Sequence, residues 1–184
     1  MKYYILPILL LLTILSIFFA GNFSSNSGIV NVNKKIKTNI FNNYNSEFIF
    51  VFFGYVGCTD ICTPRLEELS KIYKKLKYTK GISIDTSFIN LIKLKDKELP
   101  NLFASSFHKD FDGFYLDEKM LRNMKNEFQI YSSPSLTSKG DWDHTSFLFL
   151  LKKQTDGYYL KSIYTHVPFN EEKIIKDIME NLND

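Results

Sequence analysis

The chain has 184 residues and a formal net charge of +3 at pH 7, and 45% of its residues are hydrophobic. This length suits one domain with an appendage, and the apolar content excludes general disorder. The lysines are spread along the chain, whereas nucleic-acid-binding proteins show a concentrated basic face. We therefore predict one globular domain that does not bind nucleic acid.

The first 20 residues differ from the rest of the chain. An almost wholly apolar run extends from Tyr3 to Ala20. Eighteen residues of helix rise about 27 Å, close to the hydrocarbon thickness of a bilayer. Signal cleavage after Ala20 requires a small residue at position 18, where Phe18 stands. We therefore predict that residues 1–20 are a transmembrane anchor or an uncleaved signal.

Residues 21–46 are rich in Asn, Ser, Gly and Lys. This composition is typical of a flexible tether, and we expect one short strand within it, around residues 28–33. The globular domain is expected at residues 47–184. It begins with six consecutive apolar residues, Phe48 to Phe53, which predict a strand that is buried on both faces.

The remaining elements follow in chain order. After the first strand come two cysteines and a helix, with Thr63 as its expected cap and Pro64 in its first turn. A final helix is expected after Asn170, its predicted cap. Between them the pattern predicts a strand region within 82–94, a helix at 118–128 and strands at 145–151 and 158–164. This order predicts an α/β domain with a central mixed β-sheet flanked by helices.

The chain has only two cysteines, Cys58 and Cys62, at the junction of the first strand and the helix. A disulfide that closes so short a loop contributes about 2 kcal/mol, against about 4 to 5 kcal/mol for a loop of a hundred residues. A helix N-terminus lowers thiol pKa, which favours chemistry over a structural disulfide or two inert thiols. Two thiolates one helical turn apart can face one ion, and such soft donors select copper(I) or zinc.

Two thiolates make an incomplete site, and three histidines are candidates for a third ligand. His108 lies in a polar stretch and is expected at the surface, while His166 is expected in a loop. His144 stands directly before a predicted core strand, where loops flanking a sheet converge. Asp141 or Asp143 is expected to orient its ring. Position alone leaves it open whether His144 is a ligand.

Two motifs resemble the Sco/SenC family of cytochrome c oxidase assembly proteins. They are FFGYVGCTDIC at residues 52–62 and DHTSFLFL at residues 143–150, and the similarity extends over about residues 47 to 180. The resemblance implies a membrane-anchored domain with a thioredoxin-like fold. It also implies that Cys58, Cys62 and His144 bind copper, as Cu(I) or Cu(II), and that the chain helps to build the dinuclear copper centre of the oxidase.

The resemblance makes a copper(I) metallochaperone, rather than an enzyme, the first hypothesis. Its expected partners are the oxidase subunit that carries the dinuclear copper site, together with other copper chaperones or thiol reductases. The alternative is a thiol–disulfide oxidoreductase in which Cys58 and Cys62 are the catalytic redox pair and keep partner cysteines reduced. A thiol peroxidase and a metal-free interaction domain fit the cysteines and His144 less well.

The resemblance also implies the location of the domain. Three lysines, at positions 34, 35 and 37, follow the apolar segment, whereas Lys2 precedes it. This charge count does not favour an exported domain. Sco domains work outside the cytoplasm, however, and the N-terminus lacks an Arg-rich, Ser-rich transit peptide. We therefore expect a single-pass protein of the cell inner membrane whose domain faces the periplasm or another extracytoplasmic side, with a mitochondrial intermembrane location as the alternative.

Overall fold

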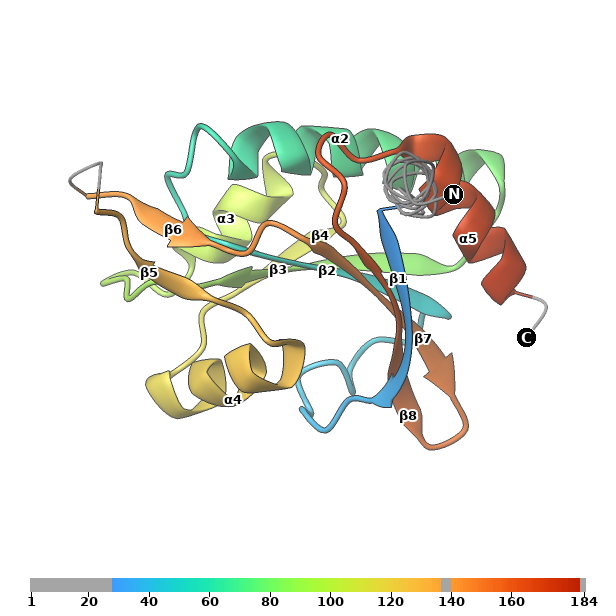
Figure 1. Cartoon of the computed structure of the whole chain (residues 1–184), viewed down its shortest axis with the longest axis horizontal. Helices are drawn as coiled ribbons and strands as arrows, with labels where there is room; N and C mark the ends of the chain where they lie inside the picture. The colour runs from blue at the N-terminus through green and yellow to red at the C-terminus, as the bar shows by residue number, and fades with distance from the viewer. Residues whose placement is uncertain (1–27, 137–139, 183–184) are drawn as a thin grey trace, which may run out of the picture.

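The computed structural model describes residues 28–136 and 140–182. Six strands form its main sheet: β1 (Ile29–Lys35), β2 (Phe48–Gly54), β3 (Ile84–Asn90), β4 (Phe111–Phe114), β7 (Leu148–Gln154) and β8 (Gly157–Tyr164). Across the sheet their order is β1-β8-β7-β2-β3-β4 (Figure 1). Strands β2, β3 and β4 are parallel, whereas β7, β8 and β1 each pair antiparallel with their neighbours. The predicted central mixed sheet is therefore confirmed.

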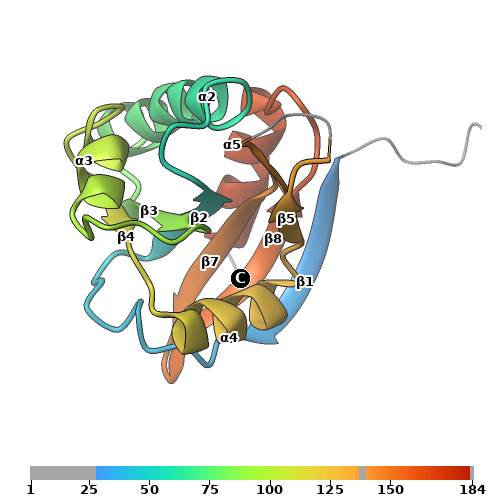
Figure 2. The same ribbon diagram turned by 90° about the vertical axis from the view of Figure 1, so that its left-hand side faces the viewer.

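Helices cover both faces of this sheet. They are α2 (Cys62–Lys74), which continues into a π-helical turn η2 (Lys75–Thr79), α3 (Leu99–Ser105), α4 (Glu118–Phe128) and α5 (Glu171–Asn181). Figures 1 and 2 show α2, α3 and α5 on one face and α4 on the other. A separate two-stranded sheet, made of β5 (Ser132–Pro134) and β6 (Trp142–His144), extends beyond the main sheet.

Strand β2 lies at the centre of the domain, and every one of its residues is buried. Successive residues of a strand point to opposite faces, so its apolar run serves two cores. Phe48, Phe50 and Phe52 pack with the α2 and α5 side. The alternate residues of the strand pack with α4 on the other side. The residues that follow β2 are therefore held at the carboxyl end of a central, rigid strand.

Polar side chains cap the N-termini of helices α4 and α5. Asp117 caps α4, because its side chain accepts a hydrogen bond from the amide of Met120. Asn170 caps α5 in the same way by accepting from the amide of Lys173 at 3.0 Å, which confirms the predicted cap. Such caps satisfy amides that have no partner within the helix.

The start of α2 differs from the prediction. Thr63 does not cap the helix, because α2 begins at Cys62, two residues before Pro64, the first helical residue that a Thr63 cap predicts. The Thr63 hydroxyl instead donates to the Cys58 carbonyl at 3.1 Å. The sulfur of Cys58 accepts from the amide of Cys62 at 3.2 Å and so takes the position of a capping group.

The predicted boundary at residue 47 is too late in the chain. The strand expected near 28–33 is β1, and it pairs with β8 as part of the main sheet. Ile36 and Phe41, between β1 and β2, are buried in the core on the α4 side. The physical reason is that an edge strand with polar outward residues resembles a tether in composition. Residues 28–46 therefore belong to the folded domain.

The predicted anchor at residues 1–20 lies outside the described residues. Within 28–136 and 140–182, no helix has both the length and the apolar character needed to cross a membrane.

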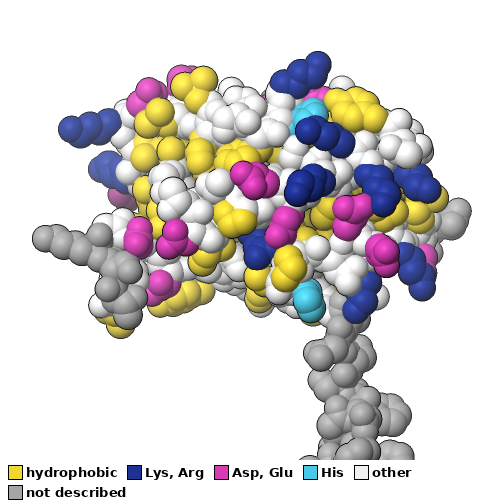
Figure 3. Space-filling model, turned by 90° about the horizontal axis from the view of Figure 1, so that it is seen from above, with side chains coloured by type: hydrophobic (Ala, Val, Ile, Leu, Met, Phe, Trp, Pro, Cys, Tyr) yellow, Lys and Arg dark blue, Asp and Glu magenta, His cyan; other side chains and the backbone are white. Residues whose placement is uncertain are grey.

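Figure 3 looks down on the face that α2 and α5 cover, where basic and acidic side chains are interspersed. That face shows no concentrated basic stripe of the kind that nucleic-acid binding requires.

Candidate metal centre

Cys58 lies on the loop that connects β2 to α2, and Cys62 lies where this loop ends. Cys58 is held by its backbone, because its amide donates to the carbonyl of Tyr55 at 3.2 Å and its carbonyl accepts from the amide of Thr63 at 3.2 Å. Cys62 is the first residue of α2 and is fully buried, while Cys58 is 4% exposed. The loop therefore places two free thiols side by side at the N-terminus of a helix.

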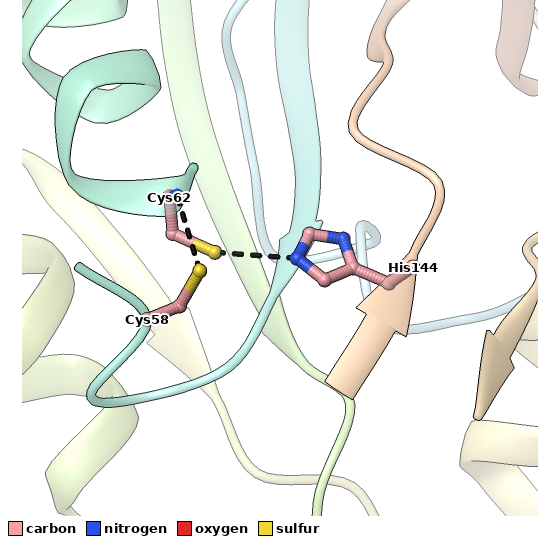
Figure 4. Close-up of side chains that lie close together, drawn as sticks. All are labelled: Cys58, Cys62 and His144. Atoms are coloured by element: carbon pink, nitrogen blue, oxygen red, sulfur yellow. Dashed lines mark hydrogen bonds between the residues drawn. The ribbon is translucent and has the colours of Figure 1, made fainter. Parts of the chain in front are cut away.

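His144 comes from the other sheet, at the end of β6. Its Nε2 lies 3.5 Å from the sulfur of Cys62, although 82 residues separate them in the chain (Figure 4). The two sulfurs and a ring nitrogen of His144 all lie within 4.8 Å of one another. The fold thus brings together the three residues that the sequence singles out.

The ring of His144 is oriented by a backbone carbonyl. Its Nδ1 lies 3.0 Å from the carbonyl oxygen of Thr145, which can only accept, so Nδ1 donates. In the neutral ring this leaves the lone pair of Nε2 directed toward the cysteines. The predicted orientation by Asp141 or Asp143 is therefore wrong. Asp141 instead accepts from the Tyr55 hydroxyl at 3.4 Å.

The two thiols have opposite protonation preferences. A hydrogen bond from the Cys62 side chain lowers the pKa of Cys58 to about 4, with help from His144 and backbone amides. The same hydrogen bond, together with burial, raises the pKa of Cys62 above its ordinary value. The site therefore favours the thiolate form of Cys58 and the protonated form of Cys62.

The imidazole responds to this thiolate. Burial disfavours the charged form of His144, but hydrogen bonds to Cys58 and to the Thr145 carbonyl outweigh it, so its pKa is raised. A metal ion that binds both sulfurs must displace the proton of Cys62 and the hydrogen bonds among the three groups.

The other histidines lie elsewhere. His108 is partly buried, with its ring 4.8 Å from that of Tyr73, rather than fully at the surface as predicted. His166 is exposed in the loop after β8, as expected. In the part of the chain that the structure describes, Cys58, Cys62 and His144 form the one group of three or more His, Cys, Asp or Glu side chains placed to hold a metal ion.

Comparison with known families identifies this arrangement. A family model described as SCO1/SenC matches residues 31–183. The chain belongs to the SCO1/SenC family. The match begins within β1, which agrees with a folded domain that starts before residue 47.

Relatives from other organisms resemble this SCO1/SenC chain over most of its length. An SCO2-like protein of Rickettsia prowazekii is 26% identical over 126 residues, which are 66% of this chain and 60% of the relative. The mitochondrial protein SCO1 of Saccharomyces cerevisiae is 23% identical over 141 residues, which are 74% of this chain and 46% of the relative. The chain therefore spans three fifths or less of these two relatives.

Solved Sco structures share its fold. The solution structure of apo Sco1 from Thermus thermophilus has a TM-score of 0.62 at 19% identity and covers 83% of this chain and 91% of that chain. The crystal structure of yeast Sco1 with copper bound has a TM-score of 0.62 at 22% identity and covers 75% of this chain and 77% of that chain. These matches confirm the predicted thioredoxin-like fold.

Two residues of the site were missed by sequence reasoning. Gly54 lies under the sulfur of Cys62, and Tyr55 reaches from the cysteine loop to β6. Both come within four residues of Cys58 in the chain, which is only a weak indication that they belong to the site. Their roles depend on contacts with residues far along the chain, which a sequence pattern does not reveal.

Proposed function

We propose that this chain is a copper(I) metallochaperone in which Cys58, Cys62 and His144 bind the ion. The single observation that carries the proposal is the convergence of two free thiols and an imidazole nitrogen within 4.8 Å. Thiolates are soft ligands that select copper(I), and imidazole suits copper as well. The yeast Sco1 structure with copper bound supports copper over zinc.

The geometry suits an ion that is carried and then released. Copper is the cargo here, and ligands of a carrier must exchange with those of a partner. The site favours the thiolate on Cys58 and a proton on Cys62, and an ion that binds both sulfurs must displace that proton. Binding therefore releases a proton, and the affinity for copper(I) should rise with pH.

The same cysteines couple binding to redox state. A disulfide between Cys58 and Cys62 forms when the Cys58 thiolate and the Cys62 thiol give up two electrons to an oxidant, with release of the single Cys62 proton. Since the thiolate is the metal ligand, the disulfide removes both sulfur ligands. Oxidation would then release the ion, and reduction would restore the site.

Delivery to cytochrome c oxidase completes the proposal. We propose that residues 1–20 anchor the chain in the inner membrane, that the domain faces the periplasm, and that the ion passes to the dinuclear copper site of an oxidase subunit. Membership of the SCO1/SenC family supports this role. Other copper chaperones or thiol reductases would load or reduce the site.

A second candidate is a thiol–disulfide oxidoreductase that reduces partner cysteines. The observation that favours it is that two free thiols lie together at the start of α2, with the pKa of Cys58 lowered and that of Cys62 raised. A thiolate attacks a disulfide, and a neighbouring thiol then resolves the mixed disulfide.

One experiment separates the two. The full chain in detergent, either loaded with copper(I) or reduced and metal-free, is mixed with the copper-binding domain of an oxidase subunit. We expect the loaded chain to transfer copper to the reduced, metal-free domain, as measured by copper content after separation. Copper that stays on the chain, together with rapid reduction of the oxidised domain by the metal-free chain, would contradict the metallochaperone and favour the reductase.

A further inference from the structure

We propose that Tyr55 is a positioning residue for the copper(I) site, which holds the β5–β6 hairpin, and with it His144, in a fixed place against the cysteine loop. This inference rests on the proposed function, because it concerns how the third ligand of that site is held. It assigns a role to a side chain that does not itself touch the ion.

The need for such a residue follows from the sheet topology. The cysteines follow β2 of the six-stranded sheet, whereas His144 lies on β6 of the separate two-stranded sheet. No strand ladder joins these two sheets in the described residues. Residues 145–147 link His144 to β7, which pairs with β2, and the remaining freedom of the hairpin relative to the cysteine loop is limited by side-chain contacts.

Tyr55 contacts both sides of the site. On the cysteine side, its carbonyl accepts from the amide of Cys58 at 3.2 Å. On the hairpin side, its hydroxyl donates to Oδ1 of Asp141 at 3.4 Å and accepts from the backbone amide of Trp142 at 3.4 Å. These two residues lie three and two positions before His144.

The ring of Tyr55 also borders the imidazole. The ring centroids of Tyr55 and His144 are 5.8 Å apart, and the planes cross at 84°, an edge-to-face arrangement. The side chain is well enclosed, since Tyr55 is only 7% exposed. The ring limits where the imidazole can turn, while the hydroxyl limits where the hairpin can lie.

The substitution Tyr55→Phe separates these two contributions. It keeps the ring and removes the hydrogen bonds of the hydroxyl to Asp141 and to the Trp142 amide. Both bonds are long, so their loss should loosen the hairpin and leave the domain folded. Asp141 is exposed and can be solvated in the variant.

Tyr158→Phe is a matched control. Tyr158 is 6% exposed, and its hydroxyl also makes two hydrogen bonds, to the carbonyls of Ser46 at 2.7 Å and Tyr44 at 3.3 Å. It lies on β8 and takes no part in the copper site. A general loss of stability from a buried hydroxyl would appear in both variants.

The first measurement is a competition titration of the full, reduced chain with copper(I) and a chromophoric chelator. We expect Tyr55→Phe to lower the affinity about tenfold, the lower end of the range for residues that orient metal ligands. In a His144→Ala background the same substitution should change nothing further, because the ligand it positions is gone. Tyr158→Phe should leave the affinity unchanged in both backgrounds.

The second measurement needs no metal. Trp142 is the only tryptophan of the chain and its amide bonds to Tyr55, so its fluorescence reports on the hairpin. We expect quenching by acrylamide to increase in Tyr55→Phe and to stay unchanged in Tyr158→Phe.

An equal loss of copper affinity with and without His144 would overturn the inference, because Tyr55 would then act on the cysteines or on the fold. Unchanged affinity in Tyr55→Phe, when His144→Ala does weaken binding, would overturn it as well. If wild-type affinity does not depend on His144, the three-ligand proposal fails. The Trp142 measurement then decides by itself whether Tyr55 holds the hairpin: increased quenching supports this, and unchanged quenching contradicts it.

Discussion

The sulfur of Cys62 lies against the backbone of Gly54 at the end of β2. A Cβ atom built at position 54 would be 2.6 Å from Cys62 Sγ and 3.0 Å from the ring of Phe88. Neither neighbour has room to move, because Cys62 and Phe88 are fully buried. The absence of a side chain at Gly54 is therefore what allows the second sulfur to face the site.

Gly54→Ala should displace the sulfur of Cys62. We expect the affinity for copper(I) to fall by at least about tenfold, as for other changes that move a metal ligand. Overpacking should also lower the free energy of unfolding by about 1 to 3 kcal/mol. Competition titration and urea unfolding measure the two effects.

Gly81→Ala is the control for this variant. Gly81 has a φ of +68° and no atom near its Cβ position, so alanine there is strained but clashes with nothing. It should cost about 1 to 2 kcal/mol of stability and leave copper affinity unchanged. Equal affinities for wild type and Gly54→Ala would show that the close approach does not shape the site.

Reactivity of Cys58 should be almost independent of pH near neutrality. Its pKa of about 4 leaves it ionised throughout this range. In the metal-free, reduced chain we expect the alkylation rate by iodoacetamide, followed by peptide mass spectrometry, to be constant from about pH 6 to 8, because the thiolate is the nucleophile. An ordinary thiol would react about tenfold faster per pH unit over that range.

The same pKa has a consequence for stability. An unfolded cysteine titrates near about pH 8.5, so the folded state binds fewer protons below that value. The stability contributed by the Cys58 thiolate is thus full above pH 8.5 and is lost as the pH falls through about 4. The difference in free energy of unfolding between wild type and Cys58→Ser should shrink as the pH is lowered.

Oxidation should abolish copper binding. The sulfurs of the two free thiols lie within 4.8 Å of one another. A disulfide between them would leave neither sulfur able to bind copper as a thiolate. After treatment with diamide, a two-electron thiol oxidant, we expect no copper(I) to bind, and dithiothreitol should restore one ion per chain. Copper bound equally well by the oxidised chain would mean that the sulfurs are not the ligands.

Phe41 should contribute strongly to stability, although it lies in the segment expected to be a tether. It is 1% exposed, and its ring meets that of Phe128 with centroids 6.3 Å apart. Phe41→Ala should lower the free energy of unfolding by about 3 to 5 kcal/mol. Leu136→Ala, at a position that is 99% exposed, should change it by less than about 0.5 kcal/mol. If both variants changed the free energy of unfolding by similarly small amounts, residues 36–46 would behave as a tether and not as part of the core.

The elements with a strong periodic pattern could be predicted from the sequence. The apolar run of β2 and the capped helices α4 and α5 follow directly from their residues. A short strand near residues 28–33 could be predicted, but its membership of the main sheet could not, because most side chains of β1 are exposed at the edge of the sheet. Strands β5 and β6 have three residues each, too few to show an alternating pattern.

The site was predictable to the extent that it depends on residue type. The spacing of Cys58 and Cys62 indicates a pair on one helical turn, and the family resemblance selects His144. The groups that hold these residues could not be predicted. The Thr145 carbonyl is a backbone group that every residue has, and Gly54 and Tyr55 act through contacts that only the fold creates.

The most direct test of the account is a copper(I) competition titration of the full, reduced chain and five single variants. We expect one ion per chain in the wild type, loss of tight binding in Cys58→Ser and Cys62→Ser, and weakened binding in His144→Ala. His108→Ala and His166→Ala, which remove histidines outside the site, should bind as the wild type does. A wild type that binds no copper(I), or a His144→Ala variant with unchanged affinity, would contradict the three-ligand site.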